Sequence, residues 1–251
     1  MTDYSRKFYD DLGNTALPSA RRIVPILLEL LAPASVIDVG CGDGSWLSVF
    51  RENGVEDAFG LDGDWVDDNQ LKIPAQCFRR TRLDQPFRIE RRFDIALCLE
   101  VAEHLPETSA REFISQLTTL APIVFFSAAI PFQGGLHHVN EQWPDYWAGH
   151  FESHGYHAID TIRPRIWNDP EVTWWYKQNA LLFATDDAIS GNDKLKQAWR
   201  AAPRGPLSLV HPEKFLHVAK LKKPGFGSWI KMGPRALKHS LSRCFHRLRG
   251  E

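Results

Sequence analysis

The sequence predicts an α/β protein with a doubly wound, seven-stranded and mostly parallel sheet. Short apolar runs rich in β-branched residues alternate with amphipathic helical segments along most of the chain, as expected for a parallel sheet covered by helices on both faces. The first run, 36–39, passes directly into glycines at every second position: Gly40, Gly42 and Gly44. Glycines at this spacing are typical of a tight turn between a strand and a helix.

The remaining elements follow in chain order. A helix is expected before Pro33, beginning near Leu17, and Pro25 predicts an early helix end or a kink. Further helices are expected at 107–120 and at 140–154, the second with Pro144 in its first turn. Strands are expected at 36–39, 58–62, 93–99, 123–130, 157–162 and 179–185, and one more strand is expected to end at 81–84.

The loop at 40–44 has the composition of a ligand-binding turn. Glycines let the backbone approach a ligand closely, and the start of the following helix offers free N–H groups. The spacing is Gly-x-Gly-x-Gly, which differs from the Gly-x-Gly-x-x-Gly of dinucleotide-binding folds. Asp38 lies at the end of the strand itself, where its carboxylate can face an ammonium group.

This stretch resembles the first motif of the class I S-adenosylmethionine-dependent methyltransferases, which have a Rossmann-like fold, and the resemblance extends over about 36–185. It implies that S-adenosylmethionine is the cofactor. It also implies that Asp62 accepts hydrogen bonds from the ribose and that Asp84 lies near the adenine. The implied cofactor-binding residues are Asp38, Gly40, Cys41, Gly42, Gly44, Asp62, Gly63, Leu83, Asp84, Leu99 and Glu100.

Candidate catalytic residues follow the fourth and fifth expected strands. Glu100, Glu103 and His104 follow the fourth, and His137 and His138 follow the fifth. The first group resembles the Glu-x-x-Glu-His motif of small-RNA 2′-O-methyltransferases, which implies a Mg²⁺ or Mn²⁺ site made of Glu100, Glu103, His104 and His138. Two alternatives stay open: His137 or His138 acts as a metal-free general base, or the loops are purely structural.

The acceptor is sought among residues near this expected site. Aromatic and amide side chains at 143–147 and 167–179 suit a sugar or a flat small molecule, and their mixed charges do not form a basic RNA groove. These segments also resemble bacterial methyltransferases of glycan and small-molecule pathways. The preferred hypothesis is O-methylation of a sugar, glycan or other small-molecule hydroxyl. The alternatives are an RNA 2′-O-methyltransferase with a divalent metal and a non-catalytic, cofactor-binding partner subunit.

Composition sets the organisation. The chain has 251 residues, 30 Lys plus Arg against 31 Asp plus Glu, and four scattered cysteines, so neither a global polyanion-binding charge nor a disulfide framework is indicated. With no apolar signal segment, a cytoplasmic protein is expected. Three parts are predicted: a helical segment at 1–33, a catalytic domain at 34–186 and an extension at 187–251. The basic residues of 220–251 predict an amphipathic helix that contacts a membrane surface or a polyanion, or else packs on the body.

Overall fold

The structure, a computed structural model, describes residues 6–221, without the side chains of 6–14 and of a few positions near residue 220. It divides into two compact units, one ending at His211 and the other beginning at Pro212 with helix α9 (Pro212–Leu221). None of the described helices is long and apolar enough to cross a membrane. The amphipathic helix predicted within 220–251 lies almost entirely outside the described residues.

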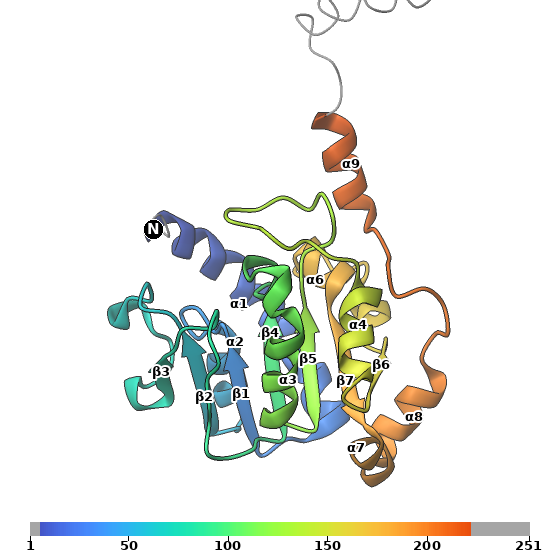
Figure 1. Cartoon of the computed structure of the whole chain (residues 1–251), viewed down its shortest axis with the longest axis horizontal. Helices are drawn as coiled ribbons and strands as arrows, with labels where there is room; N and C mark the ends of the chain where they lie inside the picture. The colour runs from blue at the N-terminus through green and yellow to red at the C-terminus, as the bar shows by residue number, and fades with distance from the viewer. Residues whose placement is uncertain (1–5, 222–251) are drawn as a thin grey trace, which may run out of the picture. The chain divides into compact units, whose positions relative to one another are not determined.

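A seven-stranded sheet forms the centre of the first unit (Figure 1). Its strand order is β3-β2-β1-β4-β5-β7-β6, and β7 runs antiparallel to both of its neighbours while the other pairs are parallel. The strands are β1 (Ser35–Val39), β2 (Asp57–Asp62), β3 (Phe78–Arg80), β4 (Ile95–Leu99), β5 (Ile123–Ser127), β6 (Tyr156–Ile159) and β7 (Leu181–Thr185). The predicted fold class is confirmed.

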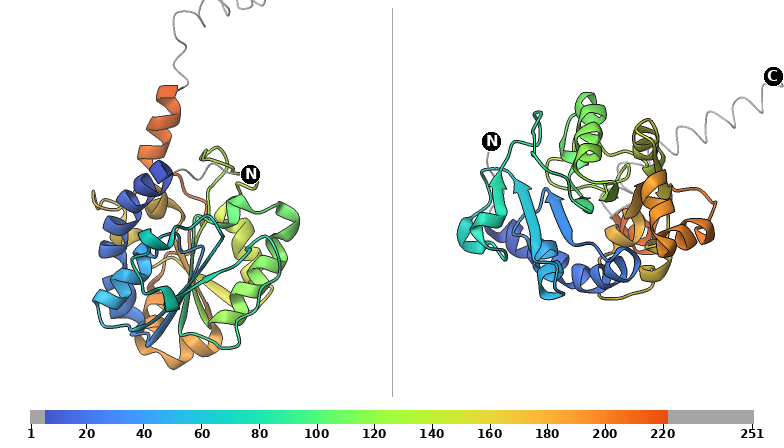
Figure 2. Two further views of the ribbon diagram at one scale, coloured as in Figure 1. Left: turned by 90° about the vertical axis from the view of Figure 1, so that its left-hand side faces the viewer. Right: turned by 90° about the horizontal axis from the view of Figure 1, so that it is seen from below.

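Helices cover both faces of this sheet (Figure 2). Helices α1 (Arg6–Leu31) and α2 (Ser45–Glu52) pack on one face, and α3 (Ala110–Leu120) and α4 (Pro144–Glu152) pack on the other. Strand residues alternate between these two layers: Leu97 joins the α1 side and Cys98 joins the α3 side. Because both faces are buried, the central strands are mostly apolar, as is typical of parallel sheets, with Asp38 near the carboxyl end of β1 as the charged exception.

The N-terminal helix differs from the prediction. Helix α1 begins at Arg6 and continues through Pro18 and Pro25 to Leu31. The expected start near Leu17 is therefore wrong, and of the two alternatives at Pro25, an early end or a kink, the early end is wrong. A proline inside a helix costs roughly 3 kcal/mol. Ala20, Ile23, Val24 and Leu27 on this helix are fully buried, and burying side chains of this size offsets that cost.

Several other boundaries also shift. The third strand ends at Arg80, so 81–84 form a turn instead of a strand end. The fifth strand ends at Ser127 instead of residue 130, and the helix expected at 140–154 begins at Pro144. The short elements are η1 (Asp68–Gln70), η2 (Ala75–Cys77), η3 (Ala102–His104), η4 (Glu107–Ser109), α5 (Arg163–Ile166) and α6 (Trp174–Asn179).

The segment after β7 continues the first unit. Helices α7 (Asp186–Gly191) and α8 (Asp193–Ala201) follow β7 directly. The Asn192 side chain donates to the carbonyl of Leu30 over 3.2 Å, and Leu195 is fully buried. The division into compact units therefore falls after His211, whereas the sequence predicted an extension beginning at residue 187.

Candidate functional site

Two groups of polar residues lie at the carboxyl ends of the parallel strands. One follows β1 and β2, and the other follows β4 and β5. Because β7 is antiparallel, the residues that precede it reach the same edge of the sheet. They include Gln178 and Asn179 at the end of α6, both fully or almost fully buried. The topology thus gathers residues that are up to 140 positions apart in the sequence at one edge.

The glycine-spaced loop at 40–44 adopts a backbone that side chains rarely allow. Its three glycines have φ values of 85°, 55° and 77°, all in the left-handed region that favours glycine. A Cβ atom on Gly40 would lie 2.3 Å from a methyl carbon of Val101. The loop therefore packs directly against the segment after β4, and Gly40 admits no larger residue without displacing Val101.

Asp62 at the end of β2 holds this loop in place. Its carboxylate accepts hydrogen bonds from the backbone N–H groups of Gly42, at 2.7 Å, and Gly63, at 2.6 Å. Burial raises the pKa of Asp62, and the two N–H groups oppose that rise. The side chain of Trp65 also hydrogen-bonds to this carboxylate, and a carboxylate with three donors still has room for a further one. The predicted ribose contact of Asp62 stays a prediction.

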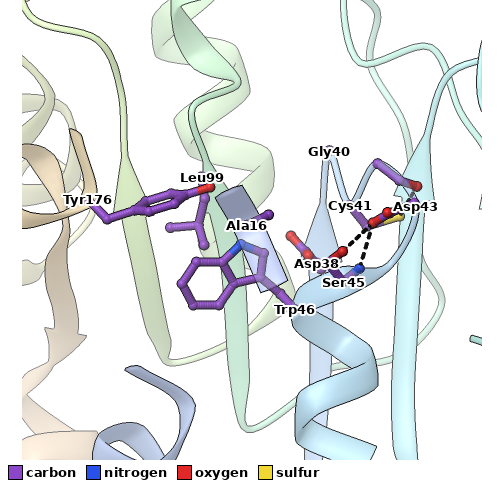
Figure 3. Close-up of a pocket in the computed structure, with 10 residues that line it drawn as sticks. Ala16, Asp38, Gly40, Cys41, Asp43, Ser45, Trp46, Leu99 and Tyr176 are labelled. Carbon is purple, nitrogen blue, oxygen red and sulfur yellow. Dashed lines mark hydrogen bonds between the residues drawn. The ribbon is translucent and has the colours of Figure 1, made fainter. Parts of the chain in front are cut away.

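A small pocket opens beside the loop (Figure 3). Its walls come from five elements: Asp38 of β1, Ala16 of α1, Trp46 of α2, Leu99 of β4 and Tyr176 of α6. The Asp38 carboxyl is almost fully buried, and its Oδ2 has no hydrogen-bond partner. Burial, with smaller contributions from two neighbouring acids, raises the pKa of Asp38 well above its usual range. Such a group suits a cationic ligand, because a cation would compensate the buried charge.

The other predicted cofactor residues differ in their placement. Cys41 and Leu99 line the pocket, whereas Leu83 and Asp84 do not. Leu83 is buried in the turn after β3, and Asp84 is exposed and pairs with Arg82 over 2.7 Å. This arginine lowers the pKa of Asp84. The predicted adenine contact of Asp84 stays a prediction.

The second polar group is centred on a fully buried glutamate. Glu103, in η3 after β4, accepts a hydrogen bond from the N–H of Ala129 at its Oε1, whereas its Oε2 has no donor partner. Burial raises the pKa of Glu103 well above its usual range, and the adjacent carboxyl of Glu100 adds to this effect. Two neighbouring buried carboxyls need a proton or a cation between them.

Two histidines face the same point. Ligand atoms of Glu103, His104 and His138 all lie within 4.8 Å of one another, and the two rings meet edge to face with centroids 4.8 Å apart. His104 Nδ1 is buried without a partner, and burial lowers the pKa of His104 to about 4. His104 is therefore neutral at pH 7, as a metal-binding imidazole must be.

The orientation of His138 is set by Glu141 and by a glycine. His138 Nδ1 lies 2.9 Å from Glu141 Oε1. A carboxylate only accepts, so Nδ1 donates, and in the neutral imidazole Nε2 then carries the lone pair. This carboxylate–histidine arrangement is common behind metal-binding histidines. A Cβ on Gly135 would lie 2.1 Å from Nε2, so the loop accommodates His138 only because residue 135 is glycine.

Glu100 lies beside this cluster and is held by two amide side chains. It is not one of the three residues whose ligand atoms converge. Its two carboxylate oxygens accept hydrogen bonds from Gln133, at 2.7 Å, and Asn179, at 3.0 Å. Its φ of 56° is in the left-handed region, which is costly for a residue other than glycine and is often found at functional sites. The candidate metal centre thus contains Glu103, His104 and His138, with Glu100 adjacent.

His137, the other predicted base, also has a strained backbone, with a φ of 61°. The sequence analysis missed Gln133 and Asn179, whose amides hold Glu100, and Glu141, which pairs with His138. An antiparallel last strand could have pointed to Asn179, because it brings the end of α6 to the carboxyl edge of the sheet. The role of Lys72 was also missed: it forms an ion pair with Asp43 of the glycine loop and donates to the hydroxyl of Ser45.

Comparison with solved structures shows the same fold. Magnesium protoporphyrin IX methyltransferase from Synechocystis, solved with bound S-adenosylmethionine, is 20% identical with a TM-score of 0.50, over 74% of this chain and 87% of that one. CalS10 from Micromonospora echinaspora, an amino pentose methyltransferase, is 12% identical with a TM-score of 0.52, over 73% and 98%. The sugar N-methyltransferase KedS8 from Streptoalloteichus is 12% identical with a TM-score of 0.54, over 74% and 96%.

No curated protein sequence matches this chain significantly. A family model described as a methyltransferase domain does match, over residues 14–165. This span contains the glycine loop, Asp62, the three converging metal-competent residues and Glu100. It covers more than half of the sequence, and the chain therefore belongs to the methyltransferase domain family.

Proposed function

We propose that the protein transfers the methyl group of S-adenosylmethionine to a hydroxyl of a sugar, glycan or other small-molecule acceptor. Two observations support the cofactor. The buried, unpartnered carboxyl of Asp38 suits the ammonium group of its methionine part, and the loop held by Asp62 offers glycine backbone against which the cofactor can lie. Bound S-adenosylmethionine supplies a methyl group on a positively charged sulfur.

The single observation that carries the reaction type is the convergence of Glu103, His104 and His138. A hydroxyl is a weak nucleophile at neutral pH, so a methyltransferase that uses one needs a base or a metal. One carboxylate and two imidazoles suit a divalent ion such as Mg²⁺ or Mn²⁺. The donorless Glu103 Oε2 and His104 Nδ1 fit such an ion, because a cation would compensate both buried atoms. A bound divalent ion lowers the pKa of a hydroxyl that it contacts.

The preference for a small acceptor rests on the side chains around this centre. No Asp, Glu, Lys or Arg occurs in 128–140, the segment that carries both candidate histidines. A phosphate backbone needs cations along its path, and this loop offers none. This weakens the RNA alternative.

The test is a methyl-transfer assay with radiolabelled S-adenosylmethionine. Acceptors would be simple glycosides with vicinal hydroxyls and, in parallel, short RNA with a free 3′ end. We expect transfer to glycosides that stops with EDTA and returns with Mn²⁺ or Mg²⁺. Transfer that is insensitive to chelation would contradict the role of a metal. Transfer to RNA alone would contradict the proposal of a small-molecule acceptor.

A further inference from the structure

The loop that carries His137 and His138 also presents an unusual amount of apolar surface. We call residues 128–143, between β5 and α4, the acceptor loop (Figure 1). Up to His211, six large apolar side chains of the described residues are exposed, and four of them belong to this loop. The exposed side chains of the loop are Phe132 at 85%, Leu136 at 43%, Val139 at 66% and Trp143 at 41%. Exposed apolar side chains concentrated in one segment mark an interaction surface.

The backbone of the acceptor loop is fixed, so this exposure is built in. The N–H groups of Val139 and Asn140 both donate to the carbonyl of Glu103, at 2.9 Å and 3.0 Å. The Gly134 N–H donates to Glu141, which also holds His138. Phe132 has a φ of 66°, a strained conformation for an aromatic residue that persists only where the surroundings impose it.

The apolar side chains are displayed outward. None of them lines the pocket beside the glycine loop, whereas the apolar part of a small ligand is normally enclosed in a concave pocket. The segment 128–140 has no ionisable residue other than its two histidines. The one acid of the acceptor loop, Glu141, is largely buried and is engaged by Gly134 and His138. An outward-facing apolar surface suits the boundary between lipid headgroups and acyl chains, where Trp and Phe are favoured.

The charge needed for such a surface is found elsewhere in the chain. Residues 222–251 contain eight Lys or Arg residues and a single acid, Glu251. Each cation near an anionic bilayer contributes about 1 kcal/mol. Stable peripheral binding usually requires two signals, such as an apolar insertion and a basic segment, and this chain has both.

We propose that the acceptor loop docks on an anionic membrane surface by inserting Phe132, Leu136, Val139 and Trp143 at the level of the headgroups. The site would then act on an acceptor presented at that surface, such as a lipid-linked glycan. The nature of the acceptor rests on the proposed function, but docking does not, because vesicle binding requires no methyl transfer. Failure of docking and failure of catalysis are therefore distinguishable.

The experiment is flotation of the full chain with vesicles of phosphatidylcholine alone or mixed with phosphatidylglycerol. We expect binding to the anionic vesicles that weakens as salt rises. Phe132→Asp and Val139→Asp should each weaken it roughly tenfold, because a charge replaces an inserted apolar group. Asp tolerates the left-handed conformation of residue 132 better than Phe does, so the first variant should fold, and retained binding of S-adenosylhomocysteine checks this.

Val210→Asp is the matched control, because Val210 is also an exposed apolar residue, at 44%, but lies outside the loop. It should bind vesicles like the wild type. Replacing Arg243, Arg247 and Arg249 by Glu in the full chain should remove the salt-sensitive part of the vesicle binding. The proposal is overturned if the wild type ignores anionic vesicles at low salt, or if both loop variants bind like the wild type. It is also overturned if Phe132 affects only the binding of monomeric alkyl glycosides, since the loop would then serve a soluble acceptor.

Discussion

The glycine loop and the Glu103 centre lie at the same edge of the sheet but are built in different ways. In the glycine loop, the N–H groups of Gly42 and Gly63 bind Asp62, and a single side-chain atom, Asp38 Oδ2, is left without a partner. In the other region, Glu103 Oε2 and His104 Nδ1 both lack partners, and ligand atoms of Glu103, His104 and His138 lie within 4.8 Å of one another. We infer that the glycine loop suits a bound molecule with one cationic group. The Glu103 centre suits a small cation that several side chains coordinate. Binding of the cofactor and activation of the acceptor should therefore be separable by mutation.

The largest expected effect comes from removing a residue of the centre. Glu103→Ala and His138→Ala should each lower methyl transfer by about 10²–10⁴-fold, the usual range for groups that activate a nucleophile. Both should bind S-adenosylhomocysteine with nearly the wild-type affinity in calorimetry. His157→Ala is the control, because His157, on β6, is exposed and pairs with Asp186 of α7, away from the centre. A parallel loss of cofactor binding would mean that the two regions are not separable.

Asp38 should affect only the cofactor side. Asp38→Asn should weaken the binding of S-adenosylmethionine by roughly 10- to 100-fold, because it removes a charge-assisted hydrogen bond worth about 1.5–3 kcal/mol. The affinity for methylthioadenosine, which lacks the ammonium group, should be unchanged. If the affinity for both ligands falls equally, Asp38 does not contact the ammonium group.

The raised pKa of Asp38 sets how the stability of the free protein and the binding of the cofactor depend on pH. Because burial raises its pKa in the folded protein, the free protein is destabilised as pH rises from about 4, where an unfolded Asp ionises, to the raised value. Within that window, a cofactor that requires the carboxylate should release a proton on binding. Calorimetry in buffers with different ionisation enthalpies should detect this release in the wild type and not in Asp38→Asn.

A smaller effect tests the geometry of His138. A methyl group at residue 135 would occupy the space of His138 Nε2, so Gly135→Ala should weaken Mn²⁺ binding by roughly 10- to 100-fold, as when a metal ligand loses its support. Gly149→Ala is the control, since a Cβ there meets nothing within 4 Å. Unchanged metal affinity in Gly135→Ala would mean that Nε2 is not a ligand.

The smallest effect is expected at Asp84. Asp84→Ala should weaken the cofactor by about 1 kcal/mol, roughly fivefold, through the implied adenine contact. Asp57 is a close match for the control, because it is equally exposed and pairs with Arg91 as Asp84 pairs with Arg82. If Asp57→Ala and Asp84→Ala have the same effect, Asp84 acts only as a surface ion pair.

The same comparison explains what the sequence could predict. The glycine loop is local, because the motif from Asp38 to Gly44 specifies its own turn and requires the close packing on Val101. The doubly wound, mostly parallel sheet of seven strands followed from the alternating elements and the resemblance. The boundary of α1 did not, because the burial of Ala20, Ile23 and Leu27 outweighs the local effect of two prolines.

The Glu103 centre depends on contacts between distant segments. Sequence spacing suggested that Glu100 and Glu103 lie together, and their carboxyls are adjacent. The amides of Asn179 and Gln133, which hold Glu100, could not be predicted from that spacing. The first of these contacts spans 79 positions, and no local pattern encodes it. Glu141 was visible three residues after His138, and its role became clear only from the geometry of the loop.

The central claim is that Glu103, His104 and His138 form a metal centre independent of the cofactor site. Titration of Mn²⁺ into the wild type and His138→Ala, each with and without S-adenosylhomocysteine, tests it most directly. We predict one ion per wild-type chain, its loss in His138→Ala, and the same affinity for S-adenosylhomocysteine in both proteins. Absence of Mn²⁺ binding to the wild type, or a loss of S-adenosylhomocysteine binding in His138→Ala, would contradict the account.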